Sequence, residues 1–280
     1  MAVCIITDST SDFTCKQVQE LGVEVVSQKV RFGQREYIDG AELTPEEFYQ
    51  KLAQSDALPQ TAQVNPEEFC QAFRQALDRG DQVFGLFLSS DLSGTYQSAL
   101  AAREICGGQG IYLTDSRNVT IGLNLLVRQA ASLRQAGAGA EQIQREIEAL
   151  KPRVRLCAAV DTLKYLRMGG RLSGAAAALG ELLNIKPLVA VEQGKVEAVA
   201  KARGQQAALQ WLEDRLERQK PDLQYPVMFG HSAAPQLCQD FADRVLSRLP
   251  GCAKHIAQIG SAVGTHVGPG AVGLAYIERE

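Results

Sequence analysis

A serine- and threonine-rich segment directly follows a strongly apolar run. After QVFGLFL come Ser89, Ser90, Ser93 and Thr95, and helical spacing begins at about Gly94. A helix start presents free backbone N–H groups and a partial positive charge, and nearby hydroxyl groups add further donors. In open α/β sheets, ligands bind where a strand ends and the next helix begins. This pattern predicts a site for a carboxylate or a phosphate.

Ser93 has three candidate roles in such a site. Serine is a common helix N-cap, and capping is compatible with contacting a ligand. A catalytic nucleophile would need a G-x-S-x-G turn and a histidine oriented by an acid. The local sequence is DLSGT instead, and His231, His255 and His266 lie in scattered contexts. The nucleophile elbow is therefore missing, and a triad would depend on a spatial arrangement that the sequence does not reveal.

Three other features are candidates for a ligand site. The segment GPGAVG at 268–273 matches G-x-G-x-x-G, but it lies near the end of the chain and Pro269 has no amide donor, so it is interpreted as a close-approach loop. The histidines are single, and His, Cys and acidic residues show no metal-ligand spacing, so no metal is expected. Arg171, in the segment GGRLSG, has two candidate roles: capping a helix C-terminus or pairing with a carboxylate.

Composition limits the class of protein. The chain has 280 residues, a formal charge of -3, and Lys and Arg spread along its length, which argues against nucleic acid or anionic membrane as a partner. Seven cysteines without a C-x-x-C pair, and no recognisable secretory leader, predict reduced thiols in a cytoplasmic protein. Apolar runs fall short of the ~20 residues that span a bilayer, so integral membrane association is not expected.

The elements that would position these residues alternate between strands and helices. In the first half, strands are predicted at 3–8, 23–30, 82–88 and 110–115, with helices starting at Pro45, Pro66 and about Gly94 and covering about 121–135 and 141–150. Unbroken apolar strands are typical of a parallel sheet with helices on both faces. A domain boundary is predicted near Pro152, which gives domains at 1–152 and 153–280.

The second half predicts a mixed α/β domain. Strands are expected at 155–160, 186–191, 195–201 and 225–231, and Gln193-Gly194 is typical of a tight hairpin turn. Helices are expected at 161–169, in the alanine-rich segment after GGRLSG, at about 205–218 and after His231, followed by a glycine-rich final segment. The expected fold class is α/β with two domains and a ligand between and within them.

Several sequence blocks together resemble the DegV family over residues 1–280. These blocks are CIITDSTSDF, PQTAQVNPEEF, SSDLSGTYQSA, TDSRNVTIGL, DTLKYLRMGGRLSG, LVAVEQGKVEAVAKARG and SAVGTHVGPGAVGLAY. The resemblance implies two α/β domains that enclose one long-chain fatty acid, with the acyl chain in an apolar tunnel. It also implies a non-catalytic role, because some members present the bound carboxylate to a separate ATP-dependent fatty acid kinase that forms an acyl phosphate used in phospholipid synthesis.

The resemblance also assigns residues. Thr61 and Ser93 match the family's carboxylate contacts, His266 matches its late histidine, and Arg171 and Arg203 match arginines linked to head-group organisation or kinase productivity. The Gly94 amide would complete the donor set with Thr61, Ser93 and His266. Around Thr61 the sequence reads TAQVN where the family has TSQPS, which removes one hydroxyl and some loop rigidity.

Two other functions remain open from the residues. One is a Ser93-dependent hydrolase of acyl esters, and the other is a regulatory binder of a different apolar anion. No cofactor is expected besides the bound fatty acid. For His266, a structural hydrogen bond between the domains is the alternative to a ligand contact, and its protonation state is left open.

Overall fold

The N-terminal half is built on a parallel sheet. The computed structural model describes residues 2–173 and 184–280. Four parallel strands lie in the order β2-β1-β6-β7. Their bounds are Val3–Asp8 (β1), Val23–Val26 (β2), Gln82–Phe87 (β6) and Ile111–Asp115 (β7). All six residues of β1 are buried, as expected for a parallel strand covered on both faces. The predicted parallel sheet is therefore confirmed.

The C-terminal half contains a mixed sheet in the order β13-β12-β14-β8-β10-β11-β9. Its strands are Val154–Ala159 (β8), Leu172–Ser173 (β9), Ile185–Glu192 (β10), Lys195–Arg203 (β11), Val227–His231 (β12), Lys254–Gln258 (β13) and Val272–Ile277 (β14). The pairs β12–β13 and β11–β9 are parallel, and the other pairs are antiparallel. β10 and β11 form the predicted hairpin around Gln193-Gly194. β13 and β14 were not predicted as separate strands.

A small antiparallel sheet corrects one prediction. The expected strand at 23–30 is two strands in different sheets: β2 ends at Val26, and Lys29–Phe32 (β3) pairs with Arg35–Ile38 (β4) and Gln60–Ala62 (β5). The chain leaves the parallel sheet at Gln28, whose backbone N–H donates to the Ser9 hydroxyl at 3.0 Å. Three consecutive polar residues, Ser27, Gln28 and Lys29, interrupt the apolar pattern at this point, but they do not show which sheet the chain enters next. Thr61 lies on β5, paired with Val30.

The helices begin largely where the sequence predicted. They are Cys15–Leu21 (α1), Pro45–Ala53 (α2), Pro66–Asp78 (α3), Thr95–Ile105 (α4), Thr120–Gln135 (α5), Ala140–Leu150 (α6), Lys164–Met168 (α7), Gln205–Gln219 (α8), Pro235–Leu246 (α9) and Ser261–Val267 (α10), with short 3-10 turns at Ser9–Ser11 (η1) and Lys151–Arg153 (η2). Thr44 and Asn65 each form a capping box at the predicted starts. The alanine-rich helix predicted after GGRLSG lies outside the described residues.

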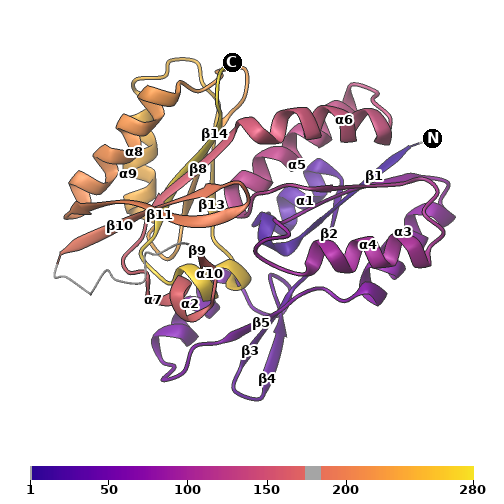
Figure 1. Cartoon of the computed structure of the whole chain (residues 1–280), viewed down its shortest axis with the longest axis horizontal. Helices are drawn as coiled ribbons and strands as arrows, with labels where there is room; N and C mark the ends of the chain where they lie inside the picture. Colours follow the sequence, from indigo (N-terminus) through magenta and orange to yellow (C-terminus); the bar gives the residue numbers. More distant parts are fainter. Residues whose placement is uncertain (1, 174–183) are drawn as a thin grey trace.

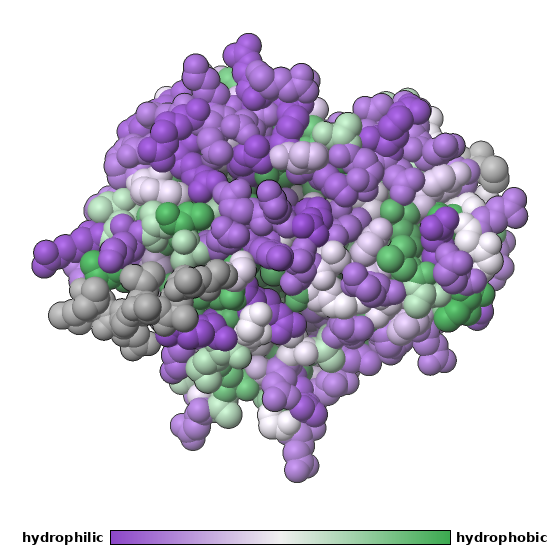
Figure 2. All heavy atoms as spheres, viewed as in Figure 1, coloured by the Kyte–Doolittle hydropathy of each residue, from purple (hydrophilic) through white to green (hydrophobic). Residues whose placement is uncertain are grey.

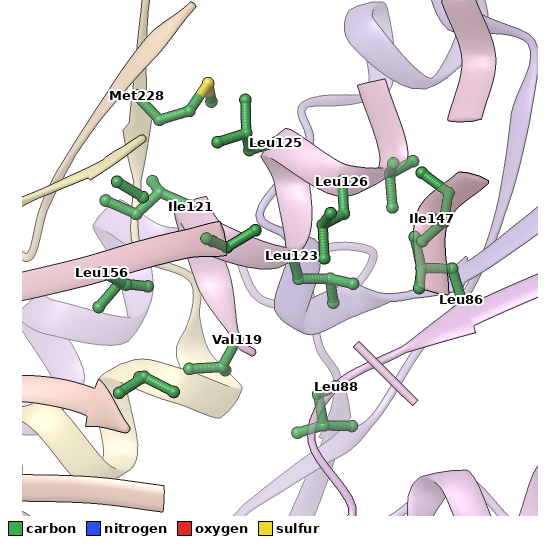
Figure 3. Close-up of a cluster of buried hydrophobic side chains, with 14 of the residues drawn as sticks. Leu86, Leu88, Val119, Ile121, Leu123, Leu125, Leu126, Ile147, Leu156 and Met228 are labelled. Carbon is green, nitrogen blue, oxygen red and sulfur yellow. The ribbon is translucent and has the colours of Figure 1, made fainter. Parts of the chain in front are cut away.

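α5 lies between the two large sheets and joins their cores (Figure 1). Its residues Ile121 and Leu125 lie on the side of Met228 and Leu156, while Leu126 lies on the side of Leu86 and Ile147 (Figure 3). All of these residues belong to one buried cluster. On the outer faces, α3 and α4 cover the parallel sheet and α8 and α9 cover the mixed sheet. The boundary at 152/153 stays a prediction.

The viewed surface is mostly hydrophilic, with separate small hydrophobic areas (Figure 2). Within the described ranges, no helix is long and apolar enough to cross a membrane.

Candidate functional site

One cavity lies between the two halves and collects most of the predicted site residues. Its volume is about 200 Å³. Thr61, Ser93, Gly94, Arg171 and His266 all line it, so residues separated by up to 205 positions meet at one place. Arg203 lies at the end of β11, exposed, and outside the set of described residues that line the cavity.

The wall of the cavity is largely apolar, and several of its polar residues lie next to one another, around Thr61, Gln63, Gly94 and His266; this group is called the polar end. The apolar lining comes from both halves and is made by Leu88, Leu92, Val119, Ile121, Leu156, Ala158, Leu166, Val189, Ala190, Val191, Val196, Ile259, Ala262, Val263, Val267 and Ala271, with Gly230 and Gly273. A largely apolar cavity that also contains a group of hydrogen-bond donors suits an amphipathic anion. Carboxylates fit this donor set better than cations, because its side chains carry hydroxyl, amide and guanidinium donors.

Thr61 and His266 form a pair across the cavity's polar end. Thr61 Oγ1 lies 3.0 Å from His266 Nε2. Burial, reinforced by the positive charge of Arg171, lowers the pKa of His266 to about 4, so the imidazole is neutral at pH 7. His266 Nδ1 is buried and has no hydrogen-bond partner among the described residues.

The buried Nδ1 atom selects the tautomer of His266. Nδ1 has no partner in either tautomer, but a proton on Nε2 can be donated to Thr61 Oγ1, whereas a proton on Nδ1 would be left as an unsatisfied buried donor at a cost of about 1–3 kcal/mol. Nε2–H then donates to Thr61 Oγ1, which leaves the Thr61 hydroxyl proton free to point into the cavity. The pair therefore supplies a donor whose direction is set by the histidine.

Ser93 lies at the start of α4, and its hydroxyl partly caps the helix. Its Oγ accepts from the Thr95 N–H at 3.3 Å and lies 3.0 Å from Thr95 Oγ1. The residue in the N-cap position is Gly94, without a side-chain cap bond. His266, which also lines the cavity, pairs with Thr61 and not with Ser93. This geometry supports a ligand contact for Ser93. Among the contacts of the described residues, no base pairs with the Ser93 hydroxyl, as a catalytic nucleophile would require.

Gly94 leaves room for a neighbouring side chain. A Cβ at this position would lie 2.0 Å from Gln63 Oε1, and Gln63 Nε2 donates to the Ser98 hydroxyl at 3.0 Å. Gln63 also lines the cavity. The absence of a side chain at Gly94 thus admits Gln63 to the polar end, where its amide adds to the donors.

Arg171 braces the loop that carries Ser93. Its Nε donates to the carbonyl of Leu92 at 3.0 Å, and Nη1 donates to the carbonyl of Gly169 at 2.6 Å. Both sequence-based roles for Arg171, helix capping and carboxylate pairing, are compatible with this position, because Gly169 is the C-cap of α7 and the side chain lines the cavity.

Buried carboxyl groups hold α10, the helix that carries His266. Asp12 accepts from the Gly260 N–H at 2.9 Å, and Asp39 accepts from the Ser261 N–H at 3.0 Å. Burial raises the pKa of Asp12 to about 8 and also raises that of Asp39. These bonds fasten the start of α10 to the N-terminal half, which places His266 opposite Thr61.

Sequence reasoning missed part of the cavity. Thr10 and Gln28 add polar groups near α4, and Gln28 is buried with its Nε2 3.5 Å from Thr95 Oγ1. Gly230, Gly273 and Ala158 form a row of small residues across β12, β14 and β8, since Gly230 pairs with Gly273 and Gly273 with Ala158. Only the pairing of distant strands brings this row together, and Gln28, flanked by Ser27 and Lys29, gives no local sign that it is buried.

The segment GPGAVG behaves as the close-approach loop that was expected. A Cβ at Gly268 would lie 2.3 Å from the Tyr165 ring, and one at Gly270 would lie 2.4 Å from Asp161. Both glycines have positive φ angles, at 73° and 83°. In the described part of the chain, no group of three or more His, Cys, Asp or Glu side chains is placed to hold a metal ion.

Comparison with known proteins relates the whole chain to one family. A family model described as "Uncharacterised protein, DegV family" matches residues 2–279. A DegV domain-containing protein of Deinococcus radiodurans is 39% identical over 282 residues, covering 98% of each chain. One from Caldanaerobacter subterraneus is 34% identical over 278 residues, covering 99% of each.

Solved structures give the same relationship. A DegV family protein from Thermus thermophilus, described as binding fatty acid, has a TM-score of 0.91 and 32% identity, covering 100% of both chains. A stearic acid-binding protein from Eubacterium ventriosum has a TM-score of 0.90 and 26% identity, covering 99% of this chain and 98% of the other. With a family model matched from end to end and relatives this similar throughout, the chain belongs to the DegV family.

Proposed function

We propose that this protein binds a long-chain fatty acid, with the acyl chain along the apolar wall of the cavity and the carboxylate at its polar end. The observation that carries the proposal is that Thr61, Ser93, Gly94 and His266 all line one largely apolar cavity. The fatty acid-binding relatives from Thermus thermophilus and Eubacterium ventriosum support it.

The energetics of the two ends differ. Burying a saturated tail of ~15 methylenes at ~0.8 kcal/mol each contributes roughly 12 kcal/mol before the cost of association. Desolvating the carboxylate costs several kcal/mol unless donors replace water. The Thr61 and Ser93 hydroxyls, the Gly94 N–H and the neutral His266 behind Thr61 supply those donors. The tail therefore provides affinity, and the head provides orientation.

The experiment is extraction of the purified protein followed by mass spectrometry. A stoichiometric fatty acid is expected, and delipidated protein should take up oleate or palmitate. Thr61→Val with Ser93→Ala should weaken uptake, whereas Ser247→Ala, which removes an exposed hydroxyl bonded to the Arg244 carbonyl, should not. A protein that is purified empty and takes up neither acid contradicts the proposal.

We also propose that the protein presents the carboxylate to a separate ATP-dependent kinase for acyl-phosphate formation, and is not itself the catalyst. The exposed position of Arg203, away from the cavity lining, supports a contact with a partner instead of the lipid. Arg203→Ala should keep fatty acid binding and lower phosphorylation by the kinase. Equal loss of both would make Arg203 a structural residue.

A further inference from the structure

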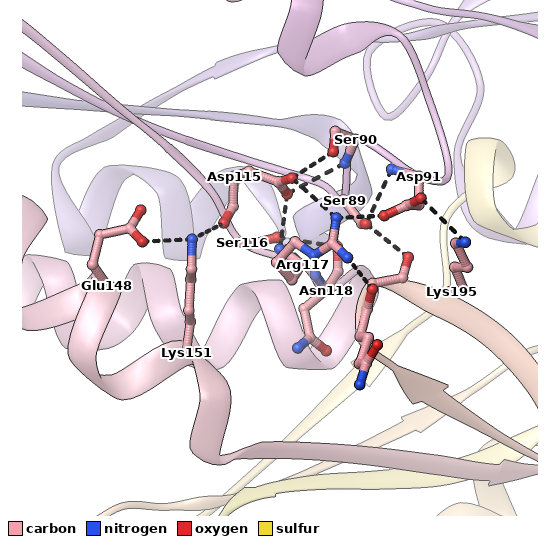
Figure 4. Close-up of polar contacts among 12 residues, drawn as sticks. Ser89, Ser90, Asp91, Asp115, Ser116, Arg117, Asn118, Glu148, Lys151 and Lys195 are labelled. Atoms are coloured by element: carbon pink, nitrogen blue, oxygen red, sulfur yellow. Dashed lines mark hydrogen bonds and ion pairs between the residues drawn. The ribbon is translucent and has the colours of Figure 1, made fainter.

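Two loops from opposite halves of the protein meet beside the cavity (Figure 4). One is the segment 88–93 after β6, and the other is the turn of the β10–β11 hairpin. The Ser89 hydroxyl donates to the Gly194 carbonyl at 2.7 Å in a buried bond. Each loop is flanked by residues of the cavity wall: Leu88 and Leu92 on one side, and residues 191 and 196 of the hairpin on the other.

The charged side chain of Arg117 contacts both of these loops. It comes from the segment between β7 and α5, and its guanidinium donates to the Asp91 carboxylate and to the Gln193 carbonyl. Lys195 lies 3.7 Å from the other oxygen of Asp91. The Arg117 and Asp91 side chains are 38% and 27% exposed, so salt in solution reaches this contact.

The backbone at this junction is strained. Arg117 and Gln193 have φ angles of 54° and 49°, in the left-handed region that non-glycine residues rarely adopt. Such conformations cost roughly 1–3 kcal/mol each and persist only where surrounding contacts enforce them. Gly194 has φ 85°, and a Cβ there would lie 2.6 Å from Ser89 Oγ and 2.8 Å from the Arg117 guanidinium. Close packing and strain therefore coincide at the turn.

We propose that these contacts form a latch that governs how fast the acyl chain enters and leaves the cavity. The hairpin latch consists of Ser89, Asp91, Arg117, the turn 193–194 and Lys195. When it opens, the hairpin turn moves away from segment 88–93 and the apolar wall parts between them. This inference rests on the proposed function, because it assigns a rate-controlling device to the same site.

The latch makes a kinetic prediction that differs from a head-group role. Its contacts involve residues outside the carboxylate donors, and it closes the wall in the empty and in the loaded protein alike. Opening then precedes both binding and release. Weakening the latch should raise the association and dissociation rate constants by the same factor and leave Kd nearly unchanged.

The test uses delipidated full-length protein and cis-parinaric acid, a fluorescent fatty acid, in stopped-flow binding and in displacement by excess oleate. Arg117→Ala and Gly194→Ala should each raise both rate constants, for Arg117→Ala by about tenfold, since two charge-assisted hydrogen bonds are lost. Kd should stay within about twofold, because the latch is closed in both the empty and the loaded protein and the substitution destabilises both equally. For the wild type, both rates should rise with added NaCl, and this dependence should shrink in Arg117→Ala.

Two variants serve as matched controls. Gly33→Ala changes a glycine with φ 59° in the β3–β4 turn, where a Cβ meets nothing within 4 Å. Arg79→Ala removes an arginine that pairs with Glu24 and Asp81 away from the cavity. Both should exchange the probe at the wild-type rate.

Three results would overturn the latch. They are unchanged rates in both latch variants, equal acceleration in Gly33→Ala, and a rise in dissociation alone with a matching rise in Kd. The last result would mean that these residues only support the head-group site. Failure of the wild type to bind the probe or to carry lipid would appear before any variant is compared, and would contradict the proposed function itself.

Discussion

The neutral state of His266 gives a prediction about stability against pH. The pKa of His266 is lowered to about 4 in the folded protein, against an ordinary value of 6.5. Above pH 6.5 neither the folded nor the unfolded state carries the proton. Between pH 6.5 and about 4, the unfolded state binds it and the folded state does not. The folded protein therefore loses stability as pH falls through this window.

The size of the effect follows from the shift. Each pKa unit corresponds to about 1.4 kcal/mol, so the free energy of unfolding contributed by His266 should fall by roughly 3 kcal/mol between pH 6.5 and 4. Buried carboxyl groups act in the opposite direction: the pKa values of Asp8 and Asp12 are raised to about 6 and about 8, so they favour folding as pH falls. The wild-type profile alone would mix these contributions.

A difference measurement separates His266 from the carboxyl groups. Urea unfolding of lipid-free wild type and of His266→Gln, which keeps a donor near the Nε2 position, is compared at several pH values from 7 to 4.5. The free energy of unfolding of the wild type, minus that of His266→Gln, should fall by about 1.4 kcal/mol for each pH unit below pH 6.5. A difference that stays flat over this range would refute the argument, because it would show that His266 titrates alike in both states.

Three further predictions concern the cavity and the C-terminal core. Gly94→Ala should weaken fatty acid binding at least severalfold, measured by fluorescence titration, because the new methyl group displaces Gln63 from the polar end; unchanged Kd would contradict this placement. Gly230→Ala, whose Cβ would lie 3.0 Å from Ile121 in the cavity wall, should shift the co-purified acids toward shorter chains in mass spectra. Glu213→Ala should lower the free energy of unfolding, measured in urea, because this buried carboxylate pairs with Arg244 and Arg248, which lose their partner. The expected loss is roughly 2–3 kcal/mol, since the two arginines are partly exposed and water can replace some of the lost contact. An unaltered urea midpoint would show that the ion pairs contribute nothing net.

Local features of the fold were predictable because their causes are local. The starts of α2 and α3 follow from Thr44-Pro45 and Asn65-Pro66 with Glu at the third helical position, and the structure has both capping boxes. The turn at Gln193-Gly194 needs only two residues with positive φ. Such signals act within a few residues and do not depend on the rest of the chain.

Features that depend on distant pairing were not predictable from the residues alone. Two features exist only because separate strands meet. One is the passage of the chain from β2 into the small sheet at Gln28, and the other is the row formed by Gly230, Gly273 and Ala158. The resemblance to the family placed Thr61 and His266 at one site, but the contact between them was not expected. The lowered pKa of His266 requires its burial, which no local pattern shows.

The placement of α5 has a consequence for how the molecule unfolds. Because this one helix contributes side chains to the packing of both large sheets, neither half can lose its structure without exposing apolar area that belongs to the other. The two halves should therefore melt as a single cooperative unit, and a ligand held in the cavity should raise the transition temperature of the whole chain. Expressed alone, either half would carry an uncovered apolar face and a tendency to self-associate.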